Sequence, residues 1–304
     1  ALGCISVSVA MVATLVHPDR AFAQDSTWLH GPVDNNYNNP FNWLPNGVPD
    51  NVGETAVFGQ SDTTLLNVSA PVTVDTWVFN ANADNYVFTN DQSLTFVGDG
   101  ITVNGGIQGI INNAGGTLSF YNDSGAGDIS IVNNDRTFFT HNSSAENATI
   151  TNNDELRFFE GATAGSASIA NNALISFING SSASGATITN NGWIGFSDAS
   201  AAGEAQITNT GLGTILEFFN SSTAANATID NNSGIVGFWR DSTAGAAQIT
   251  NTGGSAIILF NDSSSAANAA ILIDASSDGL SFQDDSTAGN AVITNDGEAR
   301  FLQN

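Results

Sequence analysis

"SSTAANATIDNN", residues 221–232, is one copy of a segment that recurs along the chain with small changes. Close variants are NSSAENATITNN (142–153), SSASGATITNN (181–191), STAGAAQITN (242–251) and STAGNAVITN (286–295). Successive isoleucines from Ile131 to Ile293 are spaced by 19 to 22 residues, and Ile110 fits one step earlier. Self-similarity at this period predicts a solenoid, in which each repeat forms one rung and stacked rungs share a core.

Each repeat contains two segments whose side chains alternate between apolar and polar. In the first segment, a small residue, usually alanine, stands two positions before the isoleucine, and hydroxyl residues flank the isoleucine. In the second segment, an aliphatic residue usually stands two positions before a phenylalanine. A period of two residues is typical of a strand with one buried face. The isoleucine and phenylalanine series are Ile131, Ile150, Ile169, Ile188, Ile207, Ile229, Ile249, Ile271 and Ile293, and Phe120, Phe139, Phe158, Phe177, Phe196, Phe218, Phe238, Phe260, Phe282 and Phe301. Where two phenylalanines are adjacent, the pattern leaves open which one faces inward.

An asparagine follows nearly every isoleucine by two positions, and Ile273 interrupts this series. Asparagine with a neighbouring Asn, Thr or Gly favours a turn between the two strands. Stacked on successive rungs, the side-chain amides are expected to hydrogen-bond to one another as a ladder. The 22-residue steps add residues mainly between isoleucine and phenylalanine, as in TNTGLGTILEFF (208–219), and these additions are expected to bulge outward.

The sequence therefore predicts an all-β chain: a parallel β-helix (solenoid) with about 19–22 residues per rung and an N-terminal cap. Residues 105–304 would form the repetitive solenoid, which stops in mid-repeat. Residues 24–104 would form the cap and irregular first rungs. Residues 1–23 are interpreted as a signal peptide without its n-region: LGCISVSVAMVATLV (2–16) is apolar, and AFA (21–23) places cleavage between Ala23 and Gln24. The true N-terminus is expected upstream, and the mature chain is expected to be exported.

Charge and composition narrow the possible partners. The chain has no lysine, five arginines and 29 acidic residues, for a net charge of −24. Nucleic acids carry the same sign of charge, so we do not expect them as partners, and acidic polysaccharides would be poor substrates unless cations bridge them. The only cysteine is Cys4, inside the proposed signal peptide, so no disulfide or cysteine-bound metal is expected in the mature chain. No cofactor motif is present.

A resemblance follows from three features together: the signal peptide, the stretch NWLPNGVP (42–49) followed by TAVFG (55–59), and rungs such as STAGNAVITN. The chain resembles the passenger region of bacterial autotransporter proteins over roughly residues 24–304. The resemblance implies a right-handed β-helix at the cell surface or outer membrane, or released outside a Gram-negative bacterium. It also implies a C-terminal outer-membrane barrel, which this sequence does not contain. A last rung left uncovered would favour end-to-end self-association.

The best catalytic candidates are aspartates at the corner two residues after phenylalanine. Asp262 and Asp284 lie on adjacent rungs, and Asp285 is next to Asp284. Neighbouring carboxylates are suited to glycoside hydrolysis or to calcium binding. The structural alternative is that aspartate replaces asparagine in an exposed turn. We favour this alternative, and we expect neither catalysis nor a bound metal.

The binding candidates are residues that directly follow the phenylalanine anchors and should point outward: Phe159, Phe219 and Trp239. Exposed aromatic side chains can stack on sugars or contact a protein. The alternative is that neighbouring turns cover them. We expect a non-enzymatic, adhesin-like structural module whose partners are surface glycans or host proteins. The alternative function is a glycan-binding or polysaccharide-active β-helix that uses the corner aspartates.

Overall fold

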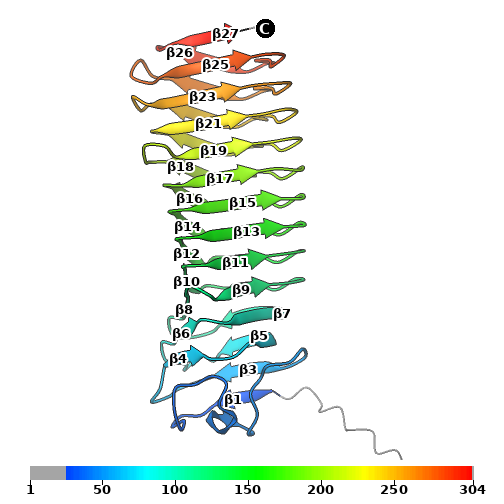
Figure 1. Ribbon diagram of the computed structural model, residues 1–304, viewed down its shortest axis with the longest axis vertical. Coiled ribbons are helices and arrows are strands. Elements are labelled where there is room, and N and C mark those ends of the chain that lie inside the picture. Colours follow the sequence, from blue (N-terminus) through cyan, green and yellow to red (C-terminus); the bar gives the residue numbers. More distant parts are fainter. Residues whose placement is uncertain (1–24, 303–304) are drawn as a thin grey trace, which may run out of the picture.

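The computed structural model describes residues 25–302 and is an all-β parallel β-solenoid of about 12 turns. The turns stack along one long axis, with the N-terminal coils at one end (Figure 1). This confirms the predicted fold class. The predicted signal peptide and its cleavage site at Ala23 and Gln24 lie outside the described residues.

Two long sheets run the length of the solenoid. All neighbouring strands pair in parallel except β1 and β2, which are antiparallel. Sheet A has 15 strands: β1 (Ser26–Trp28), β2 (Trp43–Leu44), β3 (Thr55–Phe58), β5 (Val72–Phe79), β7 (Ser93–Val103), β9 (Thr117–Phe120), β11 (Arg136–Phe139), β13 (Glu155–Phe159), β15 (Leu174–Ile178), β17 (Trp193–Phe196), β19 (Ile215–Phe218), β21 (Gly234–Phe238), β23 (Ala256–Phe260), β25 (Gly279–Gln283) and β27 (Ala299–Leu302).

Sheet B carries the isoleucine strands and has 12 members. These are β4 (Leu65–Val68), β6 (Val87–Asn90), β8 (Gly109–Asn112), β10 (Ser130–Asn133), β12 (Thr149–Asn152), β14 (Ser168–Asn171), β16 (Thr187–Asn190), β18 (Gln206–Asn209), β20 (Thr228–Asn231), β22 (Gln248–Asn251), β24 (Ala270–Ile273) and β26 (Val292–Asn295). A third side of the rung is a column of single-residue parallel bridges, from Gly100–Gly125 to Ser265–Thr287. One short 3-10 helix, η1 (Pro40–Asn42), lies among the first coils.

Phenylalanine rings form a continuous stack inside sheet A. From Phe96 to Phe301, successive ring centroids are 4.6 to 5.0 Å apart and the ring planes differ by 3° to 12°. Because strands in a sheet lie about 4.8 Å apart, identical side chains on successive rungs are held at stacking distance. The anchors Phe139, Phe158 and Phe218 face inward and are fully buried, as the predicted series requires.

Asparagine side chains at the C-terminal ends of the sheet B strands form the predicted ladder. Each Nδ2 donates to the Oδ1 of the asparagine on the next rung, at 2.7 to 3.1 Å, from Asn90 to Asn251. All these side chains are buried. Most Nδ2 groups also donate to a backbone carbonyl at the start of sheet A, as Asn190 does to Ile215 at 3.1 Å. The ladder therefore satisfies buried polar groups at the turn and ends where Asn251 pairs in register with Ile273.

The corner before each isoleucine strand has a positive φ, and it alternates between glycine and another residue. Glycine stands at 127, 165, 203, 245 and 289, and between them stand Glu146, Ser184, Ala225 and Ala267. A Cβ at Gly203 would lie 2.8 Å from the carbonyl oxygen of Ser184. A rung with a Cβ at this corner is therefore followed by a rung without one. This period of two rungs is not visible in the spacing of the isoleucines.

The first coils contain aromatic rings in mixed orientations: several pairs meet edge to face, whereas Phe58 and Phe79 stack at 4.7 Å and 16°. Trp43 meets Trp28 at 77° and Tyr37 at 74°. The Tyr37 hydroxyl donates to the Pro49 carbonyl at 2.8 Å and accepts from the Trp77 indole at 3.2 Å. Burial raises the pKa of Tyr37 well above its usual value. These contacts are specific to this end of the molecule and are not repeated along the axis.

The longer turns project outward as predicted. The turn between β18 and β19 places Leu212 at 86% exposure, whereas Ile207 and Leu216 on either side remain buried. The additional residues therefore leave the stacked core undisturbed.

Candidate functional site

The corner aspartates occupy a position that requires a positive φ. Asp262 and Asp284 both have φ of 54°, and Asn220 and Arg240 have 56° and 57° at the same corner. Asparagine and aspartate adopt this left-handed conformation more readily than most residues. The Asp262 carboxylate accepts the backbone N–H of Arg240 on the preceding rung at 3.0 Å. These observations favour a role for aspartate in the turn, and the neighbouring Asp285 is solvent exposed.

Residues 25–302 carry neither a metal-binding cluster nor a membrane-spanning helix. No cluster of three or more His, Cys, Asp or Glu side chains in this range is arranged to hold a metal ion. No helix in the same range has the length and apolar character to cross a membrane.

The outer face of sheet A carries a broad set of apolar side chains. We call it the apolar face and define it by its first column and by further apolar side chains on the same face, all of them half-buried. In the first column, in-register pairing places one residue directly next to the following one on five consecutive strands: Leu174, Trp193, Ile215, Ile235 and Ile257. Leu259 lies beside this column, two positions further along its strand. The other apolar members lie four positions further along their strands, beyond Ser176, Gly195, Glu217 and Gly237: Phe159, Ile178, Phe219 and Trp239. Water contact with so much apolar surface is unfavourable, and contiguous exposed patches commonly mark interaction sites.

Trp193 lies flat across the sheet because the residue next to it on the same face is a glycine. A Cβ at Gly195 would lie only 1.9 Å from an atom of the Trp193 six-membered ring. The indole Nε1 donates to Glu217 Oε2 on the next strand at 2.9 Å. Glycine and this hydrogen bond together fix the ring with one π-face toward the sheet.

Trp239 repeats this arrangement two rungs away. It follows the end of its strand, β21, whereas Trp193 stands at the start of β17. A Cβ at Gly237 would lie 2.7 Å from Trp239 Nε1, so this ring also extends over a glycine. Phe219 lies beside it, with ring centroids 6.4 Å apart and planes within 14°. The buried Trp239 Nε1 has no hydrogen-bond partner in the described part of the chain.

The two glycines and Glu217 form one column across three strands. Gly195 pairs in register with Glu217, and Glu217 pairs with Gly237. We call Trp193, Gly195, Glu217, Gly237 and Trp239 the tryptophan platform. It combines two flat indole rings with a carboxylate that lies between the two glycines. Such a surface offers stacking area and a hydrogen-bond acceptor within the same few rungs.

Phe159, the third predicted binding residue, lies outside the platform. The Arg157 guanidinium lies 5.9 Å from the centroid of its ring, and Arg157 also pairs with the Glu155 carboxylate. Phe159 meets Phe138 edge to face at 6.5 Å. This ring is therefore held at the edge of the apolar face by its own neighbours.

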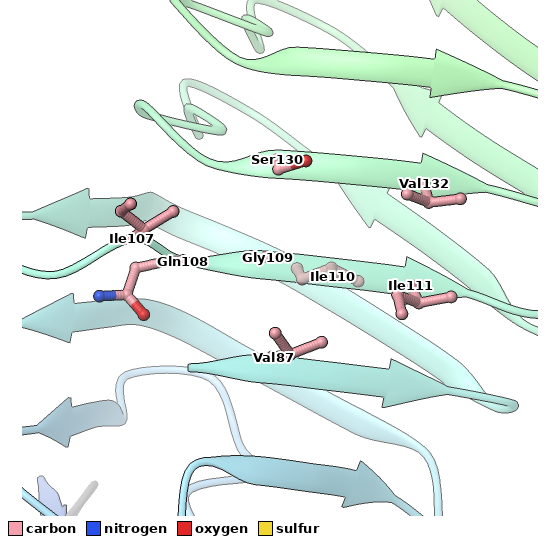
Figure 2. Close-up of a pocket in the computed structure, with 8 residues that line it drawn as sticks. All are labelled: Val87, Ile107, Gln108, Gly109, Ile110, Ile111, Ser130 and Val132. Carbon is pink, nitrogen blue, oxygen red and sulfur yellow. The ribbon is translucent and has the colours of Figure 1, made fainter. Parts of the chain in front are cut away.

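Sheet B has a shallow apolar hollow on its outer face. Gly109 lies between Val87 and Ser130 in register and leaves a gap, which Ile107, Ile111 and Val132 surround (Figure 2). The hollow has a volume of about 230 Å³. The Gln108 side-chain amide beside the hollow already makes hydrogen bonds within the protein: it accepts from the Tyr86 backbone N–H and donates to two backbone carbonyls. The Ser130 hydroxyl also lines the hollow, and one hydroxyl beside apolar side chains gives little to orient a ligand.

Phe219 and Trp239 lie close together on the apolar face, whereas Asp262, Asp284 and Asp285 lie at a corner outside it. Sequence reasoning missed Trp193 and Glu217. The available signal was the pair of segments WIG (193–195) and GFW (237–239), each of which places a tryptophan and a glycine two residues apart on the same face of a strand. Comparison with known proteins found no matching family model, curated protein or solved structure.

Proposed function

We propose that the protein is a non-enzymatic, adhesin-like β-solenoid that acts outside the cell, and that its apolar face is the recognition surface. The observation that carries this proposal is the in-register column from Leu174 to Ile257 on the outside of sheet A. The same rungs already bury a complete core on the inner face. The outer column is therefore not needed to close the fold.

Sequence features support the location. The apolar leader and the autotransporter-like segments favour export and a passenger role at the surface of a Gram-negative bacterium. The net charge of −24 keeps such a chain soluble despite the apolar face. The corner aspartates support a non-catalytic role, because the left-handed backbone and the Arg240 contact give Asp262 a use in the turn.

The test compares two charge variants on the same two rungs. Ile215→Asp with Ile235→Asp alters the apolar face, and Gln206→Asp with Thr228→Asp alters the outer face of sheet B. Beads coated with the full chain are applied to bacterial and epithelial cell layers. We expect the first double variant to lose adherence and the second to keep it, with similar unfolding midpoints. Equal adherence of both would contradict the proposal.

Catalysis is tested in the same preparation. Reducing ends are measured after incubation of the full chain with neutral and acidic polysaccharides. We expect none to be released. Release that disappears in Asp262→Asn or Asp284→Asn would establish a polysaccharide-active enzyme instead.

A further inference from the structure

The tryptophan platform has the geometry of a sugar-binding site rather than of a general apolar contact. Both indole rings lie over glycines, so each exposes a flat face instead of an edge. A flat aromatic face matches the apolar C–H face of a pyranose ring. Leucine or isoleucine at the same positions would provide area without this planarity.

The spacing of the Trp193 and Trp239 rings favours an extended sugar polymer. Gly195 and Gly237 are two rungs apart in one column, which corresponds to roughly 9–10 Å. This is about the length of one disaccharide unit in an extended 1,4-linked pyranose chain. Two rings held at this distance can therefore contact alternate sugars of one strand laid along the solenoid axis.

Polar groups on the platform fit a neutral polyol. Glu217 offers carboxylate oxygen to sugar hydroxyl donors while it also accepts from Trp193 Nε1 at 2.9 Å. Trp239 Nε1 is buried over Gly237, so this ring offers its face alone and Glu217 supplies the polar contact. The net charge of −24, the central carboxylate and the absence of lysine all disfavour an acidic polysaccharide.

A second copy of the chain is a poorer occupant of this surface. Two faces from copies that each carry a charge of −24 repel, and pairing two copies would bring one Glu217 carboxylate toward apolar surface. A sugar strand needs no burial of charge, because its hydroxyls pair with the carboxylate.

We propose that Trp193, Glu217 and Trp239 bind a neutral, extended β-1,4-linked polysaccharide along the solenoid axis. This inference rests on the proposed recognition role of the apolar face and names the ligand class for it. Trp193 and Trp239 stack on alternate sugars, and Glu217 accepts hydroxyl hydrogen bonds between them.

The test is isothermal titration calorimetry of the full chain with defined sugars. The probes are β-1,4-linked glucose and mannose hexamers, the glucose monomer and a galacturonic acid hexamer. We expect a neutral hexamer to bind, the monomer to bind far more weakly and the acidic hexamer not to bind. Trp193→Ala and Trp239→Ala should each weaken the hexamer by about five- to tenfold, and Glu217→Gln by about threefold.

The matched control is Tyr121→Ala, which removes an exposed aromatic residue after β9, several rungs from the platform. It should bind as the parent does, and all variants should unfold at the parent midpoint. Three results would overturn the inference: no hexamer binds, the monomer binds as tightly as the hexamer, or the acidic hexamer competes equally. A dimer that Ile235→Asp dissociates would assign the face to a second copy. If hexamers fail while Ile215→Asp with Ile235→Asp still abolishes adherence, the recognition role stands and only the sugar assignment is wrong.

Discussion

The first coils and the regular rungs bury aromatic rings in two different ways. Around Trp43 the rings meet edge to face, at 68° to 77°, and the polar atoms of Trp43 and Tyr37 bond to particular carbonyls. From Phe96 onward the rings are parallel within 12° and make the same contact on every rung. The difference shows that translation along the axis dictates geometry in the rungs, whereas the first coils depend on contacts that occur once.

The largest expected effect tests the repeated stack. Phe196 is fully buried between Phe177 and Phe218, at 4.6 and 4.9 Å. Phe196→Ala removes both contacts and leaves a cavity, so we expect the free energy of unfolding to fall by about 3–5 kcal/mol. Denaturant unfolding gives the value. Phe159→Ala on the outer face is the control and should cost clearly less; equal losses would mean that the stack is not the core.

A smaller loss is expected from the asparagine ladder. Asn190 accepts from Asn171 and donates to Asn209 and Ile215, whereas the exposed Asn295 side chain exchanges hydrogen bonds with the Gly297 backbone. Asn190→Ala leaves buried polar groups without partners and should cost about 2–3 kcal/mol. Asn295→Ala, at the equivalent position, should cost little. Chemical denaturation of both variants makes the comparison, and similar costs would show that the ladder adds nothing beyond a local turn.

Alkaline pH should act on the first coils. Burial raises the pKa of Tyr86 to about 12 and also raises the pKa of Tyr37 well above its usual value. Both hydroxyls hold their protons more tightly in the folded chain than in the unfolded chain, where the tyrosine pKa is about 10. Stability is therefore full below about pH 10 and is lost as pH rises through 12. Unfolding midpoints from pH 8 to 12 test this, and Tyr86→Phe should flatten the slope. A midpoint that stays constant to pH 12 would contradict it.

The smallest effect concerns buried serines at the corner after the phenylalanine stack. Ser143, Ser181 and Ser200 are fully buried, and their hydroxyls have no partner among the described residues, whereas Ala162 occupies the same position on the intervening rung. Ser200→Ala removes an unsatisfied hydroxyl, so we expect stability unchanged or raised by up to about 1 kcal/mol. Differential scanning calorimetry can resolve the shift. A clear loss of stability would show that the hydroxyl has a partner, such as a bound water.

The sequence was sufficient for the rungs because their contacts repeat. Ile131 to Ile293 and Phe120 to Phe301 predicted both inner walls, and the asparagine series predicted the ladder. The contacts of Tyr37 with Trp77 and Pro49 occur once, so no repeat in the sequence predicts them. The sequence predicted only part of the tryptophan platform. Trp239 was a binding candidate because it directly follows a phenylalanine anchor. Glu217 was not, because its position between Gly195 and Gly237 depends on the register of β17, β19 and β21.

The alternating corner has a consequence for how the molecule can change in length. Gly165 lies on the rung after Glu146, and Gly203 lies on the rung after Ser184. The unit that can be added or removed without a clash at this corner is therefore a pair of rungs. Loss of the rung that carries Gly165 alone would bring Ser184 onto Glu146, with a Cβ against backbone. Loss or duplication of two neighbouring rungs preserves the order. Lineages of this solenoid are therefore expected to shorten and lengthen in even steps, and an odd step should be accompanied by a new glycine at this corner.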